Sequence, residues 1–252
     1  MIKGIGFDFE MFKFPVGEMH VRIKKHEPFK KFSIEFVFEK NEDIIELLLV
    51  CDAMNRKGMV VENIIMPYVP FGRQDRVEVD GECFSLAVFA KLINSCNAES
   101  VMITDPHSDV TTALINNCAV KEQYQVFWQH FANAPLRDFY LICPDGGALK
   151  KIYKLAKLVE CIDVIECSKK RDTRTGQITG VVIHANNLNG KDCYIVDDIC
   201  DGGKTFIEIS KSLKACGAGK IVLMVTHGFF TKGLEVFEGL IDEIYTYKGR
   251  VK

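Results

Sequence analysis

The chain has 252 residues, of which 48% are hydrophobic and 26% charged, a composition typical of a soluble globular protein with one or two domains. Its 32 basic and 34 acidic residues leave a formal net charge of −2, which gives no field that would attract nucleic acid or anionic lipid. The first 17 residues lack an apolar signal core, and the apolar stretch 44–51 contains Glu46 and is too short to span a bilayer. We therefore expect a cytoplasmic protein with a small ligand.

The 10 cysteines are spread over residues 51–216, and several stand within apolar runs. A chain of this length does not need a disulfide scaffold, and the sequence contains no C-x-x-C pair of the kind that holds structural zinc. We expect most of these thiols to be buried and free.

The first half of the chain reads as strands alternating with helices. Residues 2–7 predict a first strand, and residues 14–23 predict a turn followed by an alternating strand. Further segments predict the strand 33–38, the helix 42–54, the strand 60–66, the helix 82–96 and the strand 100–104.

Two polar segments follow strands in this half. Residues 66–76 form a loop rich in glycine, proline and charge, and Arg73 and Arg76 suit either a solvated surface or a clamp on a polyphosphate. Asp105 and His107 stand just past the carboxyl end of the strand 100–104, the edge where open parallel sheets bind ligands. A lone histidine is more often structural, but with the aspartate it also suits a Mg²⁺-nucleotide.

The segment 116–138 is rich in aromatic residues and shows no clear period. We place the domain boundary in it, between residues 133 and 134, which gives the domains 1–133 and 134–252.

The second half begins with the predicted strand 139–143, the turn Asp145-Gly146-Gly147 and a helix. Such a turn can bind pyrophosphate with its backbone amides, or it can be a common tight connection. A short strand, 164–167, precedes the polar segment 168–177, which has four cations in six residues. This segment suits either an exposed hairpin loop or a mobile cationic lid over a phosphoryl group.

The stretch 193–205 is the most informative part of the chain. Its apolar start predicts a buried strand and the residues after it predict a helix, so the polar residues between them form a strand-to-helix turn. Gly202, Gly203 and the helix start favour an anion, while Asp197 and Asp198 suit sugar hydroxyls or Mg²⁺. A pentose phosphate fits both halves, although an acidic loop that only caps a helix is the simpler alternative. A P-loop is excluded because that pattern needs glycine at the position of Asp198.

The order of these motifs resembles that of the ribose-phosphate pyrophosphokinases, the synthetases of phosphoribosyl pyrophosphate (PRPP). Six segments carry the resemblance: residues 14–18 are similar to the family's F-x-D-G-E element, 72–76 to its A-R-Q-D-R loop, 105–107 to its D-L-H element, 144–147 to its pyrophosphate loop, 169–171 to its catalytic flexible loop and 197–205 to its ribose-phosphate loop. The resemblance implies an α/β fold with two tandem type I phosphoribosyltransferase-like domains, each a mainly parallel sheet flanked by helices. The first domain would bind ATP and the second ribose 5-phosphate.

The resemblance also implies an activity: transfer of the diphosphoryl group of ATP to the C1 hydroxyl of ribose 5-phosphate, which gives PRPP and AMP with Mg²⁺ as cofactor. The implied catalytic residues are Lys169 and Arg171, with Lys170 as a possible alternative to Lys169. The implied ATP-binding residues are Phe14, Glu18, Arg73, Gln74, Asp75 and His107. Metal binding would fall to Asp105, His107 and Asp145, pyrophosphate binding to Asp145, Gly146 and Gly147, and ribose 5-phosphate binding to Asp197, Asp198, Asp201, Gly202, Gly203, Lys204 and Thr205. In this family Phe14 and Glu18 would reach the adenine of a neighbouring subunit, which implies a homo-oligomer.

The sequence departs from the family pattern at four places. Val16 replaces an Asp or Asn, Pro106 stiffens the D-L-H element, and Gly202 and Lys204 replace the Thr and Gly of D-T-G-G-T. The chain also stops soon after Tyr247, where family members continue, so we expect a short member with open questions of assembly and allosteric control. Two alternatives remain: a catalytically silent regulatory subunit, and a PRPP-consuming phosphoribosyltransferase, which has no need of the 72–76 loop.

Overall fold

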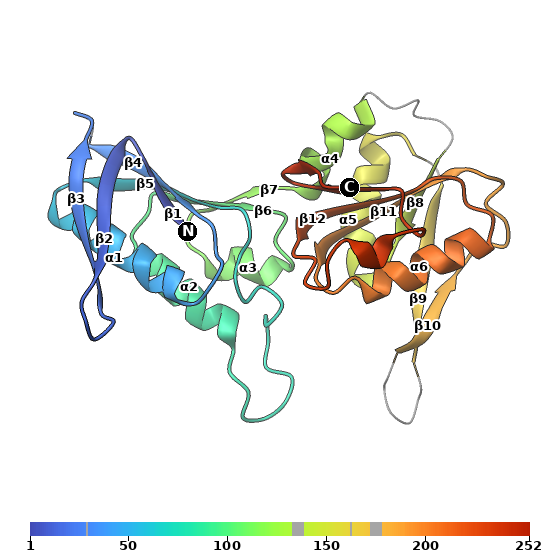
Figure 1. Cartoon of the computed structure of the whole chain (residues 1–252), viewed down its shortest axis with the longest axis horizontal. Coiled ribbons are helices and arrows are strands. Elements are labelled where there is room, and N and C mark those ends of the chain that lie inside the picture. Colours follow the sequence, from blue (N-terminus) through green and yellow to red (C-terminus); the bar gives the residue numbers. More distant parts are fainter. Residues whose placement is uncertain (29, 133–138, 162, 172–177) are drawn as a thin grey trace. The chain divides into compact units, whose positions relative to one another are not determined.

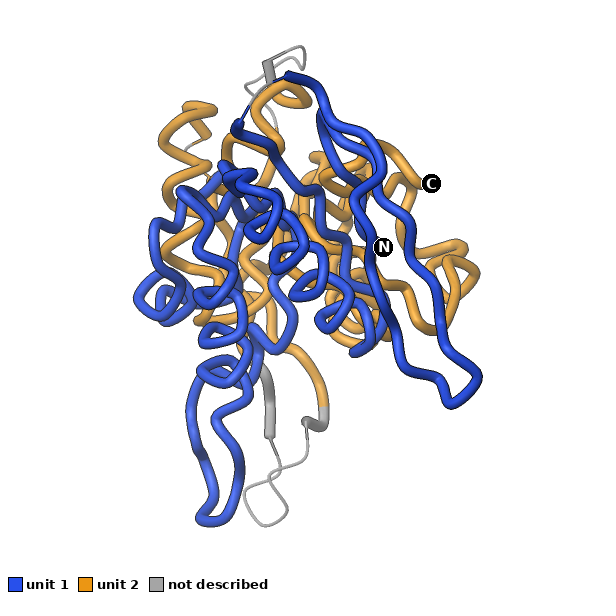
Figure 2. Tube along the Cα trace, turned by 90° about the vertical axis from the view of Figure 1, so that its left-hand side faces the viewer, with its two compact units in different colours: residues 1–121 blue, residues 122–252 orange. Residues whose placement is uncertain are grey.

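The computed structural model describes residues 1–28, 30–132, 139–161, 163–171 and 178–252, with the backbone alone at residues 132, 169–171, 178 and 179. The chain forms two compact units, Met1–Lys121 and Glu122–Lys252 (Figures 1 and 2). The predicted boundary between residues 133 and 134 lies outside the described residues.

Unit 1 is a five-stranded sheet in which four strands are parallel and the amino-terminal strand is antiparallel to its neighbour. In spatial order the strands are β1 (Ile2–Ile5), β4 (Lys31–Phe36), β5 (Val60–Met66), β6 (Ser100–Thr104) and β7 (Cys118–Lys121). The helices are α1 (Glu42–Arg56), α2 (Ser85–Ser95) and α3 (Asp109–Leu114). A separate hairpin consists of β2 (Phe7–Lys13) and β3 (Met19–His26), and β3 packs against α1.

Unit 2 is a seven-stranded sheet with five parallel strands and an antiparallel strand at each edge. In spatial order the strands are β10 (Ile178–Ile183), β9 (Val164–Arg171), β8 (Phe139–Cys143), β11 (Asp192–Cys200), β12 (Ile221–Gly228), β13 (Glu243–Thr246) and β14 (Gly249–Arg250). The helices are α4 (Gln123–Ala132), α5 (Leu149–Leu158), α6 (Lys204–Ala215) and the short 3₁₀-helices η1 (Gly146–Ala148) and η2 (Glu235–Phe237).

The central strand β11 is buried on both faces, which explains its continuous apolar run. Cys193 and Ile195 face the core shared with α6, and Tyr194 and Val196 face the core shared with α4 and α5. Helices therefore cover both faces of this sheet (Figure 1). The observed architecture confirms the predicted fold class of two mainly parallel sheets flanked by helices.

The segment 116–138, which the sequence suggested to be irregular, contains β7 and α4. Helix α4 was missed because only two of its aromatic side chains, Phe127 and Phe131, are deeply buried. These two residues stand four apart, on one helix face, and they pack in the same core as Phe139 of β8. This packing assigns α4 to unit 2.

The cysteine prediction is confirmed, because all 10 cysteines lie in the described part of the chain as free thiols and six of them are buried. Within that part, none of the helices combines the length and the apolar character that a membrane span requires.

Candidate active site

The carboxyl edge of the unit 2 sheet brings together the predicted ribose and pyrophosphate residues. Ile142 of β8 pairs with Ile195 of β11, and β8 ends one residue later. Asp197 and Asp198 therefore lie just beyond the end of β8, next to the turn that begins at residue 144. Because the two strands are parallel, both loops leave the sheet at the same edge.

The turn after β8 is shaped by Asp145. Its carboxylate atom Oδ1 accepts the backbone N–H of Gly147 at 3.0 Å and so caps η1. The buried Cys143 thiol donates to the Asp145 carbonyl at 3.1 Å. Gly146 and Gly147 are exposed, as a ligand-binding turn requires, although the Gly147 N–H is engaged by Asp145 in this structure.

Asp197 and Asp198 form a coupled pair of carboxylates. The backbone N–H of Asp198 donates to Oδ1 of Asp197 at 2.9 Å. Burial, followed by the negative charges of Asp198 and Asp145, raises the pKa of Asp197 well above its ordinary value. A bound cation or a set of hydroxyl donors would relieve this repulsion, so the site suits the ligands that the sequence suggested.

Lys151 belongs to this site, although sequence reasoning missed it. It lies in the first turn of α5, and its Nζ forms an ion pair with Oδ2 of Asp198 at 3.2 Å. Both side chains are largely buried. The available signal was a lysine four residues after Gly147, in the first turn of the helix that follows the Gly-Gly turn, but the identity of its partner required the fold.

The turn between β11 and α6 has a shape that only glycine permits. Gly203 has φ +77°, and a Cβ there would stand 2.4 Å from Cζ of Phe237. Helix α6 begins at the next residue, Lys204, and its first turn leaves backbone N–H groups that favour an anion. Asp201 is held at the start of this turn, because the Thr231 hydroxyl donates to its Oδ1 at 2.7 Å.

The predicted catalytic residues Lys169 and Arg171 stand near the end of β9. Glu166 is paired with Cys143, the last residue of β8, so the part of β9 that carries both cations extends beyond the edge of the sheet. Only their backbone is described, and the predicted lid residues 172–177 lie outside the described residues.

In unit 1, the loop after β5 lies against the turn after β6. The backbone N–H of Thr104 donates to the Pro67 carbonyl at 3.0 Å. A Cβ at Gly72 would stand 3.8 Å from Cβ of His107. Residues 72–76 and His107, which were predicted to bind ATP, are therefore neighbours.

Two aspartates of these two loops, Asp105 and Asp75, are buried. Asp105 has φ +43°, is 2% exposed and donates its backbone N–H to the Lys121 carbonyl at 2.8 Å. Asp75 is 7% exposed and accepts two hydrogen bonds from Arg76, at 2.8 and 3.1 Å. The Arg76 hydrogen bond, then Ser108 and the charge of His107, lower the pKa of Asp75. Arg73, Gln74 and His107, in contrast, are exposed.

The structure does not bring the hairpin residues Phe14 and Glu18 to this loop. They close the tip of the β2–β3 hairpin, where the Phe14 N–H donates to the Glu18 carbonyl at 2.8 Å. Figure 1 shows that this hairpin and the long loop between β5 and α2 end at separate places of unit 1. Phe14 is 49% exposed, and its ring lies 5.6 Å from that of Phe12.

Within the described residues, no three His, Cys, Asp or Glu side chains are grouped so that they could hold a metal ion. Mg²⁺ is commonly bound by one or two carboxylates together with substrate phosphates and water. The carboxylate at Asp145 fits a metal ion of that kind, which takes most of its ligands from the substrate.

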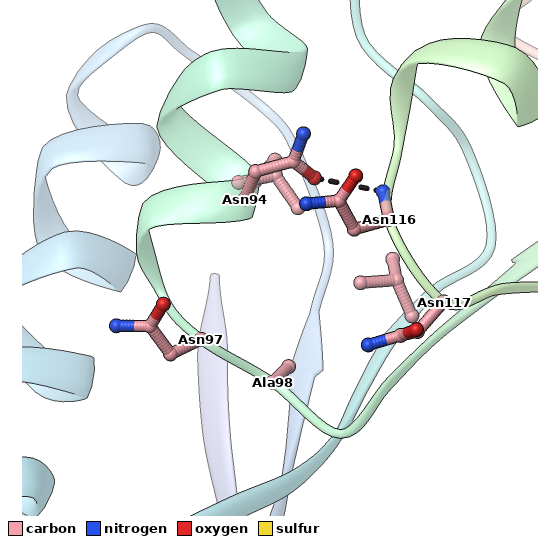
Figure 3. Close-up of a pocket in the computed structure, with 7 residues that line it drawn as sticks. Asn94, Asn97, Ala98, Asn116 and Asn117 are labelled. Carbon is pink, nitrogen blue, oxygen red and sulfur yellow. Dashed lines mark hydrogen bonds between the residues drawn. The ribbon is translucent and has the colours of Figure 1, made fainter.

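A half-open hollow with a volume of about 240 Å³ lies outside this site (Figure 3). It is lined by residues from the end of α2 and from the turn before β7, at the amino ends of the strands. The Asn94 amide donates to the Leu114 carbonyl and accepts the Asn116 N–H, both at 2.9 Å. Asn94 therefore ties the two segments together, at the sheet edge opposite the Arg73 loop.

Known proteins share this organisation. A family model of the N-terminal domain of ribose phosphate pyrophosphokinase matches residues 6–96, and one of the phosphoribosyl transferase domain matches residues 117–235. The chain is 30% identical to the ribose-phosphate pyrophosphokinases of Thermococcus kodakarensis and Pyrococcus furiosus, over 93% of its own length and 83% of each of theirs. The fold is similar to the crystal structure of phosphoribosylpyrophosphate synthetase from Mycobacterium smegmatis, with a TM-score of 0.80, 20% identity and coverage of 95% of this chain and 80% of that one.

The two parallel sheets, with a glycine turn and paired carboxylates at one edge, define a protein built from tandem phosphoribosyltransferase-type domains. The chain belongs to the ribose-phosphate pyrophosphokinase family.

Proposed function

We propose that the protein transfers the diphosphoryl group of ATP to the C1 hydroxyl of ribose 5-phosphate and so forms PRPP and AMP. One observation carries this proposal: in a member of this family, the paired carboxylates Asp197 and Asp198 stand at the same sheet edge as the Gly203 turn. The carboxylates accept hydrogen bonds from ribose hydroxyls, and the turn and the start of α6 bind the 5-phosphate. Asp201, Gly202, Lys204 and Thr205 complete the phosphate site.

The cationic segments bind and neutralise the polyphosphate. Arg73 and Gln74 hold ATP, since both are exposed beside His107, and buried Asp75 fixes the loop through Arg76. Lys169 and Arg171 stabilise the charge that develops on the transferred phosphoryl group. Little covalent chemistry is needed from the protein, because phosphoryl transfer depends on alignment and on charge neutralisation.

Mg²⁺ is the proposed cofactor, and it supplies charge neutralisation at the phosphates. Asp145 would hold one ion beside the pyrophosphate turn formed with Gly146 and Gly147, and His107 would lie near the metal-bound phosphates of ATP. Asp105 was also predicted to bind metal; it is 2% exposed, so contact with an ion there requires the turn after β6 to open.

We also propose a homo-oligomer in which the adenine site is shared between subunits. The exposed Phe14 ring offers a stacking face for adenine, and Glu18 stands across the hairpin tip from it. Because the hairpin and the Arg73 loop end at separate places of unit 1, a second subunit would have to supply one of them. A cytoplasmic location stays a prediction.

The competing functions make different demands on the chain. A PRPP-consuming phosphoribosyltransferase needs the Gly203 turn but not the first domain, and residues 6–96 match the N-terminal domain of the synthetases. A silent regulatory subunit is expected to lose the acids of the ribose site first, and Asp197 and Asp198 are both present.

The deciding experiment is phosphorus NMR of the purified protein with Mg²⁺, ATP and ribose 5-phosphate. The proposal expects AMP and the diphosphate resonances of PRPP in equal amounts, dependent on ribose 5-phosphate. Binding of both substrates without turnover would instead identify a silent subunit, and formation of ADP as the only product would exclude diphosphoryl transfer.

A further inference from the structure

The segment 229–233, directly after β12, is hydrogen-bonded to the turn that precedes α6. The Phe229 N–H donates to the Cys200 carbonyl at 2.8 Å. The Thr231 N–H donates to the Asp201 carbonyl at 3.2 Å, and the Thr231 hydroxyl donates to Asp201 Oδ1 at 2.7 Å. In Figure 1 the red segment after β12 lies beside the start of α6. Residue 232 is thus held in a fixed relation to the turn.

Lys232 uses this placement to cover Gly202. Its Cδ and Cε atoms lie 3.5 Å, and its Cγ atom 3.7 Å, from the point where a Cβ on residue 202 would stand. The alkyl stem of Lys232 therefore packs over the backbone at Gly202, while the residue as a whole stays exposed. A lysine that packs its stem in this way presents its ammonium group at the rim of the surface that it covers.

Lys232 and Lys204 flank the turn from two different elements. Lys204 is the first residue of α6, and Lys232 comes from the segment after β12. Over the part of the chain that the structure describes, neither ammonium group forms an ion pair with a carboxylate. The acid nearest to Lys204 in sequence, Asp201, directs Oδ1 to Thr231. The acid nearest to Lys232 in sequence is Glu235, whose carboxylate lies beside Gly233. Two cations thus accompany the partial positive charge of the helix start.

We infer that Lys232 is a ligand of the 5-phosphate of the pentose phosphate and a determinant of selectivity for phosphorylated over unphosphorylated sugar. This inference rests on the proposed function, which places a phosphate in the Gly203 turn. Lys232 reaches the phosphate across Gly202, and a Cβ at residue 202 would be in ordinary contact with the lysine stem at 3.5 Å. The phosphate dianion is then held between Lys204 and Lys232.

The test is isothermal titration of ribose 5-phosphate, without ATP, into the parent protein and into Lys232→Gln, Lys232→Arg and Lys157→Gln. Lys157 is the matched control, because it is also exposed but stands at the far end of α5, away from the turn. A lost hydrogen bond to a charged group predicts about tenfold weaker binding by Lys232→Gln. Lys232→Arg keeps most of the affinity, and Lys157→Gln leaves it unchanged.

Two further measurements separate phosphate binding from a structural role. Inorganic phosphate, as a competitor of ribose 5-phosphate, should also bind more weakly to Lys232→Gln, and the affinity of this variant should depend less steeply on salt. Thermal unfolding of all variants verifies that they fold alike.

The outcomes distinguish this inference from the function on which it rests. Equal affinity of the parent and Lys232→Gln for ribose 5-phosphate would overturn the role of Lys232 and leave the synthetase proposal standing. An equal loss in Lys157→Gln would also overturn it, as a general effect of charge. A parent protein that does not bind ribose 5-phosphate at all would remove the proposed function itself.

Discussion

At the scale of single residues, the ionised carboxylate of Asp197 destabilises the fold but suits the binding of a sugar. Burial and the charge of Asp198 raise its pKa, so the folded protein holds a proton at this position more tightly than the unfolded chain does. The protonated carboxyl therefore adds to the free energy of unfolding. This contribution is fully present below the ordinary aspartate pKa, about 3.9, and is lost as the pH rises through the pKa of the folded state. An ionised Asp197 is therefore destabilised by its surroundings, and hydrogen bonds from the hydroxyl groups of a sugar would stabilise it.

We expect Asp197→Asn to stabilise the fold and to weaken ribose 5-phosphate binding. The amide oxygen still accepts the Asp198 N–H, but the amide NH₂ group cannot accept a hydroxyl hydrogen bond as a carboxylate does. In thermal unfolding between pH 4 and 8, the unfolding temperature of Asp197→Asn should rise relative to that of the parent as the pH increases. Calorimetry should show that the variant binds ribose 5-phosphate about tenfold more weakly. A variant less stable than the parent at pH 8 would show that the ionised carboxylate is stabilised in the fold.

Lys169 is a second residue whose change separates binding from catalysis. We expect Lys169→Ala to lower turnover at least about a hundredfold, because the charge that it neutralises develops only in the transition state. Ribose 5-phosphate binding and thermal unfolding should stay nearly unchanged. Lys170→Ala is the control, since residues one apart in a strand occupy opposite faces and β9 includes both positions. Normal turnover in Lys169→Ala, with the loss in Lys170→Ala, would move the role to the neighbour.

At the scale of elements, the turn before α6 depends on a glycine that is required for two reasons. Gly203 has φ +77°, and a Cβ there would stand 2.4 Å from Cζ of Phe237, whereas Gly239 has φ +69° and open space around it. We expect Gly203→Ala to lower the free energy of unfolding by about 2–4 kcal/mol, from backbone strain plus overpacking, and Gly239→Ala by only about 1–2 kcal/mol. Urea titration of both variants checks this difference, and equal losses would show that Phe237 moves aside freely.

The strands of the parallel sheets were the elements that the sequence predicted best. The predicted strands 60–66 and 139–143 match β5 and β8 in full. Strand β8 is apolar along its length because it is buried on both faces, whereas β5 carries Glu62 and Asn63 at half-buried positions. The contacts between loops that complete the site could not be predicted from the sequence pattern. Lys151 meets Asp198 across 47 positions and Thr231 meets Asp201 across 30, and periodicity reports which face is buried but not which loops meet.

At the scale of the whole molecule, the two units divide the chemistry of the proposed reaction. Unit 1 gathers the exposed Arg73 and His107, and unit 2 gathers the paired carboxylates and the phosphate turn. Within unit 1, the β2–β3 hairpin ends apart from the loop that carries Arg73. A site that needs the hairpin tip of one chain and the sheet edge of another can be complete only in an assembly.

Such a shared site predicts complementation between two inactive variants. Phe14→Ala damages the hairpin that one subunit contributes, and Lys169→Ala damages the β9 cations that the other contributes. When the two are co-expressed with different tags, random pairing makes about half of the dimers mixed, and each mixed dimer keeps one intact site of two, so about a quarter of the parent turnover should return.

The controls of this experiment decide between arrangements. If hairpin and cations act within one chain, every mixed assembly has two damaged sites, and turnover stays at the mean of the two variants. A double variant, Phe14→Ala with Lys169→Ala on one chain, is co-expressed with the parent as the second control. If the site is shared between subunits, each site of a mixed dimer contains one damaged component, so only parent pairs work and about a quarter of the parent turnover remains. If the hairpin and the cations act within one chain, the parent site of each mixed dimer stays intact and about half remains. Full activity of Phe14→Ala alone would instead remove the hairpin from the adenine site and, with it, the reason to expect an assembly.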